Sequence, residues 1–132
     1  MPCHVQLRRN PDHVEADYVG TVPGPELMEA AARIMALCRE ADSPRILADC
    51  SRMDRGHSLT DLYNLAEWLA ANYPTFPVRE AVLVPPSPTL PDNFQFWEDI
   101  CQNRGHVVRT FTDRESALSW LLARPDSAPP KR

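Results

Sequence analysis

Apolar and polar residues alternate in two short segments near the start of the chain. A repeat of two is the period of a β-strand with one buried face. Asn10-Pro11-Asp12, a strong turn sequence, lies between the two segments. The pattern predicts an antiparallel hairpin with one face exposed to water. Its inward-facing residues would be Val5, Leu7, Val14, Ala16 and Tyr18.

The spacing changes after Pro23-Gly24-Pro25, which ends the second strand. Apolar residues then form one stripe of an α-helix, at Leu27, Ala31, Ile34, Met35 and Cys38. Pro25 suits a first helical turn, and acidic Glu26 suits the positive end of the helix dipole. We therefore predict a helix that begins near Glu26.

Three strand-and-helix units follow. Each starts with a short apolar run ("RILADC" at 45–50, "EAVLVP" at 80–85 and "HVVRTF" at 106–111) and continues into an amphipathic helix. Continuous apolar strands that alternate with helices are typical of parallel strands covered on both faces. The predicted fold is α/β, a five-stranded mixed sheet with an antiparallel edge hairpin and four helices, in the order β-β-α-β-α-β-α-β-α. We expect one domain over residues 1–123 and a disordered Pro-rich tail over 124–132.

Composition removes several function classes. The 132 residues carry a net charge of −4, which does not suggest nucleic-acid binding. No apolar run is long enough to span a membrane, and the first residues lack the basic segment followed by an apolar segment that is typical of a signal peptide. We therefore expect a cytoplasmic protein. Four cysteines and four histidines are dispersed without metal-ligand spacing, and we expect no cofactor and no metal. The single lysine, Lys131, leaves no Schiff-base or P-loop lysine elsewhere in the chain.

The element order resembles the STAS fold, shared by sulfate transporters and anti-sigma-factor antagonists, and in particular the stand-alone SpoIIAA-like (STAS/Sec14-like) proteins. The resemblance rests on "RILADCSRM" before "DLYNLAEWLA", then "REAVLVP", then "FWEDICQNRGHVVRTFTDRESALSWLL". It implies a non-enzymatic regulatory module that binds a protein partner or a small anionic or lipidic ligand.

In the antagonists, a kinase phosphorylates a serine or threonine at the start of the helix after the third strand. The nearest candidates here are Ser58 and Thr60. The antagonists carry Asp-Ser-Ser/Thr-Gly at this turn, whereas this chain reads "RGHSLT" from residue 55 to 60. Despite this difference in sequence, the position of Ser58 and Thr60 in the resemblance implies a modification or docking site near the start of the second helix.

The stretch from Asp49 to Ser58 has a structural and a functional interpretation. Ser58, followed three residues later by Asp61, is typical of a helix N-cap. The same helix start offers free amides to an anion, and nearby side chains would complete a ligand or partner site. The further candidates for that site are Ser51, Arg52, Arg55 and Asp49.

Two other hypotheses remain open. One is a small hydrolase- or transferase-like enzyme that uses the 49–58 loop with His57 as a base, although no third orienting group is evident. The other is a homo-oligomeric scaffold, since aromatic residues are enriched at interfaces and Phe96 and Trp97 are candidates for an interface or homodimer surface.

Overall fold

The computed structural model describes residues 3–9, 12–54, 57–86 and 91–123. Five strands and four helices follow the predicted order. The strands are β1 (Cys3–Arg8), β2 (His13–Gly20), β3 (Arg45–Met53), β4 (Arg79–Leu83) and β5 (Val107–Phe111). The helices are α1 (Gly24–Ala41), α2 (Leu59–Asn72), α3 (Asp92–Gln102) and α4 (Arg114–Leu121).

The strands form one sheet in the order β1-β2-β3-β4-β5. β1 pairs with β2 antiparallel, and every later neighbouring pair is parallel. The predicted mixed sheet with an antiparallel edge hairpin is therefore confirmed. Most of the predicted turn, Asn10 and Pro11, and the predicted tail at 124–132 lie outside the described residues.

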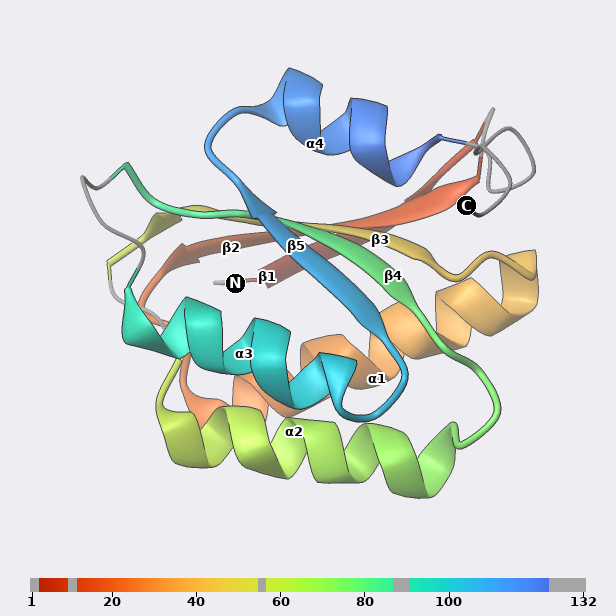
Figure 1. Cartoon of the computed structure of the whole chain (residues 1–132), viewed down its shortest axis with the longest axis horizontal. Helices are drawn as coiled ribbons and strands as arrows, with labels where there is room; N and C mark the ends of the chain where they lie inside the picture. The colour runs from red at the N-terminus through yellow and green to blue at the C-terminus, as the bar shows by residue number, and fades with distance from the viewer. Residues whose placement is uncertain (1–2, 10–11, 55–56, 87–90, 124–132) are drawn as a thin grey trace, which may run out of the picture.

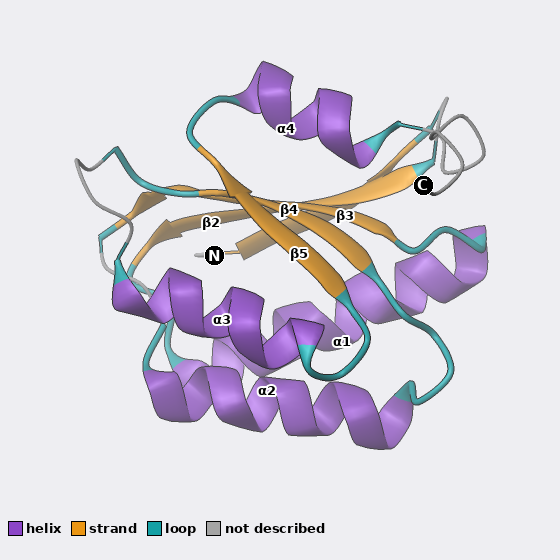
Figure 2. Ribbon diagram, in the orientation of Figure 1, coloured by secondary structure: helices purple, strands orange, loops and turns teal. Residues whose placement is uncertain are grey.

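The helices divide unequally between the two faces of the sheet. Helices α1, α2 and α3 cover one face, and α4 lies alone on the other (Figures 1 and 2). α3 packs mainly on β5 and α2, whereas α4 packs on β3, β4 and β5. No helix among the described residues is long and apolar enough to cross a membrane.

Strand β3 is longer than the sequence suggests. The apolar run ends at Cys50, and we interpreted residues 49–58 as a loop, but the strand continues to Met53. The reason is its neighbour β2, whose last residues pair with Arg52 and Met53 after a shift of register. Ser51 and Arg52 therefore lie on a strand and not in a loop, and this part of the prediction is wrong.

Two apolar cores result from the two-residue alternation of the strands. On β3, Ile46, Ala48 and Cys50 face the large core beneath α1, α2 and α3. Leu47 faces the smaller core on the other side, which is closed by Leu121 of α4. The small core is made of Leu47, Ala81, Leu83, Ala117 and Leu121, all nearly or fully buried.

A buried carboxylate ties α4 to the hairpin. Glu15 of β2 accepts hydrogen bonds from Arg114 at the start of α4 (2.7 Å) and from His13 (3.0 Å), and it pairs with Arg8 at 3.4 Å. Burial alone raises the pKa of Glu15, but the bonds from Arg114 and His13 outweigh burial and leave the pKa below its usual value. α4 is thus held by charge at its first residue and by apolar packing along its length.

Leu121→Ala tests the apolar packing that holds α4 on the sheet. Leu121 is fully buried, so its truncation leaves a cavity between α4 and the sheet, and we expect a loss of about 2–5 kcal/mol in the free energy of unfolding. The matched control is Leu59→Ala, because Leu59 is 51% exposed and its truncation should cost no more than about 0.5 kcal/mol. Urea denaturation measures both, and equal losses in the two variants would contradict this packing.

Candidate functional site

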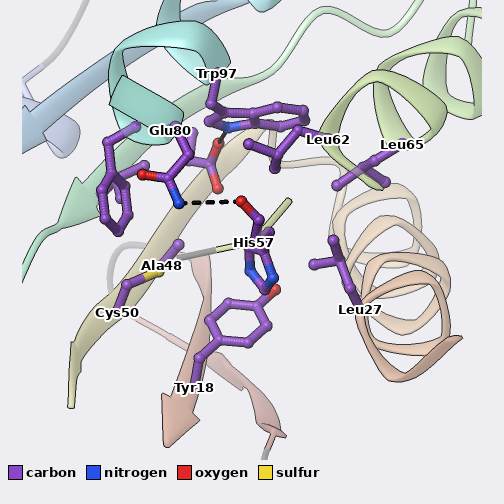
Figure 3. Close-up of a pocket in the computed structure, with 12 residues that line it drawn as sticks. Tyr18, Leu27, Ala48, Cys50, His57, Leu62, Leu65, Glu80 and Trp97 are labelled. Carbon is purple, nitrogen blue, oxygen red and sulfur yellow. Dashed lines mark hydrogen bonds between the residues drawn. The ribbon is translucent and has the colours of Figure 1, made fainter. Parts of the chain in front are cut away.

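A cavity of about 50 Å³ lies between the sheet and helices α2 and α3. Figure 3 shows side chains from strands and helices converging on it. Its lining is mainly apolar and contains a few polar groups from several elements. The lining residues are Tyr18, Leu27, Ala48, Cys50, His57, Leu62, Leu65, Glu80, Val82, Asn93, Phe94 and Trp97.

The periodicities of the elements place these side chains together. Ala48 and Cys50 are two residues apart on β3, as are Glu80 and Val82 on β4, so each pair points to the same face of the sheet. α2 contributes Leu62 and Leu65, and the first turns of α3 contribute the aromatic residues opposite. The cavity therefore lies near the beginnings of both helices.

Glu80 is the acidic group of the cavity. Its carboxylate accepts a hydrogen bond from the Trp97 indole Nε1 at 2.8 Å and points toward the middle of the cavity (Figure 3). Burial raises the pKa of Glu80 to about 7, although the bond from Trp97 opposes the rise. The side chain is therefore partly protonated near neutral pH.

His57 forms the opposite wall, just before α2. Its ring meets the ring of Tyr18 edge-on, with centroids 5.6 Å apart. Asn93 of α3 donates from Nδ2 to the His57 carbonyl oxygen at 3.0 Å, which joins the starts of α2 and α3. The ring atom Nδ1 is buried without a hydrogen-bond partner. Burial lowers the pKa of His57, so the ring is neutral at physiological pH.

The remaining polar groups of the cavity are uncharged. Burial raises the pKa of the Cys50 thiol and of the Tyr18 phenol, and nearby Glu80 raises both further. The described lining contains neither lysine nor arginine. The cavity can therefore accept apolar groups and hydrogen-bond donors, but it offers no cation to an anion.

The residues predicted from sequence do not form one site. Ser58, Thr60 and Arg52 are exposed at the start of α2 and the end of β3, outside the cavity lining. Asp49 and Ser51 bond to each other, through Ser51 N (3.0 Å) and Oγ (2.6 Å). Both lie on the α4 side of the sheet, because they alternate with Ala48 and Cys50. Arg55 lies outside the described residues.

The structure shows where the predicted N-cap and the predicted interface residues lie. Ser58 is the N-cap of α2 and accepts a hydrogen bond from Asp61 N at 3.0 Å, as its spacing predicted. Trp97, predicted at an interface, turns its indole into the cavity, and its neighbour Phe96 is partly buried against the large core.

Sequence reasoning missed Glu80, Tyr18 and Asn93. Glu80 carried a usable signal, since it is an acidic residue inside a parallel strand whose next four residues, Ala81 to Val84, are apolar. Charged residues in such positions are uncommon unless they are paired or functional. Nothing in the local sequence around Tyr18 or Asn93 shows that they line the same cavity.

The sequence matches no known protein-family model and no curated protein. Its fold is similar to the crystal structure of an uncharacterized protein from the DUF3478 family with a SpoIIAA-like fold, from Shewanella loihica PV-4. The TM-score is 0.59 at 18% sequence identity, over 90% of this chain and 93% of the other. The chain thus has a SpoIIAA-like, STAS-like α/β fold.

Ser58→Ala removes the cap of α2. We expect it to cost about 1 kcal/mol of unfolding free energy, because the amide of Asp61 loses its acceptor. Ser58→Asp supplies another cap acceptor and should remain within about 0.5 kcal/mol of the original chain. Thermal and urea unfolding measure both, and an alanine variant as stable as the aspartate variant would contradict the capping role.

Glu80→Gln should change how stability depends on pH. The raised pKa means that the folded protein holds a proton that the unfolded chain releases, so Glu80 lowers the stability as pH rises from about 4.5 to 7. The loss is on the order of 3 kcal/mol and is complete above pH 7. Glutamine cannot ionise, so the variant should lack this loss and be the more stable protein at pH 8. Urea titrations at several pH values compare the two, and identical profiles would contradict the assignment.

Proposed function

We propose that this chain is a non-enzymatic, STAS-like regulatory module that binds a small, largely apolar molecule in the cavity between its sheet and helices α2 and α3. The observation that carries the proposal is the cavity itself. Apolar walls with a few convergent polar groups are the usual composition of a small-molecule site. Of the ligands implied by the resemblance, the lipidic class fits this lining better than the anionic class, because ionised Glu80 would repel an anion.

The position of the cavity supports a regulatory role. His57 and Asn93 line it and join the starts of α2 and α3 through one hydrogen bond. A ligand that moves either residue would also move the exposed first turn of α2. Leu59 and Tyr63, at i and i+4 on that helix, are 51% and 48% exposed. They provide a surface on which a protein partner would distinguish the filled from the empty cavity.

The arrangement of nucleophiles favours binding over catalysis. The Ser58 hydroxyl caps α2, and Ser51 lies across the sheet from His57. Cys50 shares the cavity with His57, but burial raises the pKa of its thiol and so disfavours the reactive thiolate. These contacts weaken the enzyme hypothesis based on residues 49–58.

Ala48→Val tests the cavity as a ligand site. Valine adds two methyl groups to a wall of a space of about 50 Å³, so it should fill the room a ligand needs. The probe is 1-propanol, whose four heavy atoms allow at most roughly 6 kcal/mol of binding energy. We expect a saturable shift of the Trp97 indole N–H resonance in the original chain, and at least tenfold weaker binding in Ala48→Val.

The matched control is Ala71→Val, because Ala71 is exposed on α2 and the same two methyl groups there should leave binding unchanged. Trp97→Phe identifies the resonance among the three tryptophans. A shift that does not saturate, or equal binding by both valine variants, would refute the proposed ligand site.

A further inference from the structure

In the part of the chain that the structure describes, the hydrogen-bond acceptors of the cavity are not matched by donors, and its negative charge is not matched by a cation. Glu80 uses one oxygen for the Trp97 indole, and among the described residues no other side chain or amide donates to its carboxylate. His57 adds a second acceptor. Its Nδ1 is buried and has no hydrogen-bond partner, and in the neutral ring with its proton on Nε2 this atom is a buried lone pair. A buried acceptor without a donor is costly, and a ligand that donates to it removes that cost.

The donors that face the cavity are few and neutral. The Tyr18 hydroxyl and the second N–H of Asn93 are available, while the first N–H of Asn93 is bonded to the His57 carbonyl. The described lining holds no positive charge to balance Glu80. A ligand with several N–H donors and a positive charge would supply hydrogen bonds to the unpaired acceptors and a charge to balance Glu80.

The aromatic walls favour the same ligand. Trp97 of α3 and Tyr18 of β2 lie on opposite sides of the cavity (Figure 3), and Phe94, three residues before Trp97 on α3, also lines it. Aromatic faces attract cations, with estimates of up to about 2 kcal/mol when the cation is desolvated. A carboxylate among aromatic rings is therefore chemically suited to an ammonium group with a short hydrocarbon attached.

We infer that the cavity selects a small primary ammonium ion, whose N–H groups donate to Glu80 and to His57 Nδ1 while its hydrocarbon chain lies against the aromatic and leucine walls. The inference rests on the proposed function, because it names the ligand class for the same site. The cavity accommodates a group of about four heavy atoms, so the ammonium group would be the buried end of the ligand.

The charge on Glu80 gives this selectivity a pH dependence. The titratable groups near it are neutral at physiological pH, because burial raises the pKa of each thiol and of the phenol and lowers that of the imidazole. These groups are Tyr18 on β2, Cys50 on β3, Cys38 on α1, Cys101 on α3 and His57 before α2. Ammonium binding should therefore strengthen as Glu80 ionises, near pH 7.

Three matched probes test the inference on the full chain: n-propylammonium, 1-propanol and propionate, each followed through the Trp97 indole resonance at pH 7.5. We expect n-propylammonium to bind at least tenfold more tightly than 1-propanol, and propionate to bind most weakly. Glu80→Gln should weaken n-propylammonium binding at least tenfold and remove its preference over 1-propanol. A dispersed amide spectrum verifies that this variant is folded.

The original chain provides a second test that needs no substitution. Between pH 5.5 and 8, its affinity for n-propylammonium should rise about tenfold, while its affinity for 1-propanol stays constant. Binding of 1-propanol with n-propylammonium no tighter would overturn the ammonium inference and leave the apolar site intact. Preferential binding of propionate would overturn it in favour of an anion site. Failure of all three probes to bind would overturn both this inference and the proposed function.

Discussion

The order of the strands is the constraint on which the rest of the structure depends. Each parallel connection steps to the next strand in the same direction across the sheet. Because crossovers between parallel strands share one hand, three successive steps in one direction place their helices on the same face. α1, α2 and α3 therefore share a face, and only α4, which leads to no further strand, is left to cover the other. The cavity lies on this three-helix face, between the sheet and helices α2 and α3.

The second constraint is the two-residue period of the strands. It assigns neighbouring residues of β3 to opposite sides, so that Cys50 lines the cavity while Asp49 and Ser51 bond to each other on the α4 side. On the same principle β4 directs Glu80 inward, among apolar and aromatic side chains. Burying a carboxylate there is unfavourable, and an apolar residue of similar size would stabilise the fold more. A residue that lowers stability yet lies at a cavity is the kind of exception expected at a functional site.

The two polar centres of the protein show how burial and partners decide the state of a carboxylate. Glu15 is buried beside two arginines and a histidine, and its pKa falls below its usual value, so it acts as a permanent charge that holds α4 to the hairpin. Glu80 has one neutral donor, the Trp97 indole, and its pKa rises to about 7. The first carboxylate is a structural anchor, whereas the second changes its charge near neutral pH.

The sequence by itself determined the elements, their order, the mixed sheet and the Ser58 cap, because these follow from local periodicity and from contacts within a few residues. It did not determine where β3 ends, since its last residues are strand only because β2 extends beside them. Nor did it assemble the cavity, whose Tyr18, Glu80 and Trp97 come from three separate elements. Their meeting depends on strand register and on the way α2 and α3 pack. Those are long-range properties that only the tertiary structure decided.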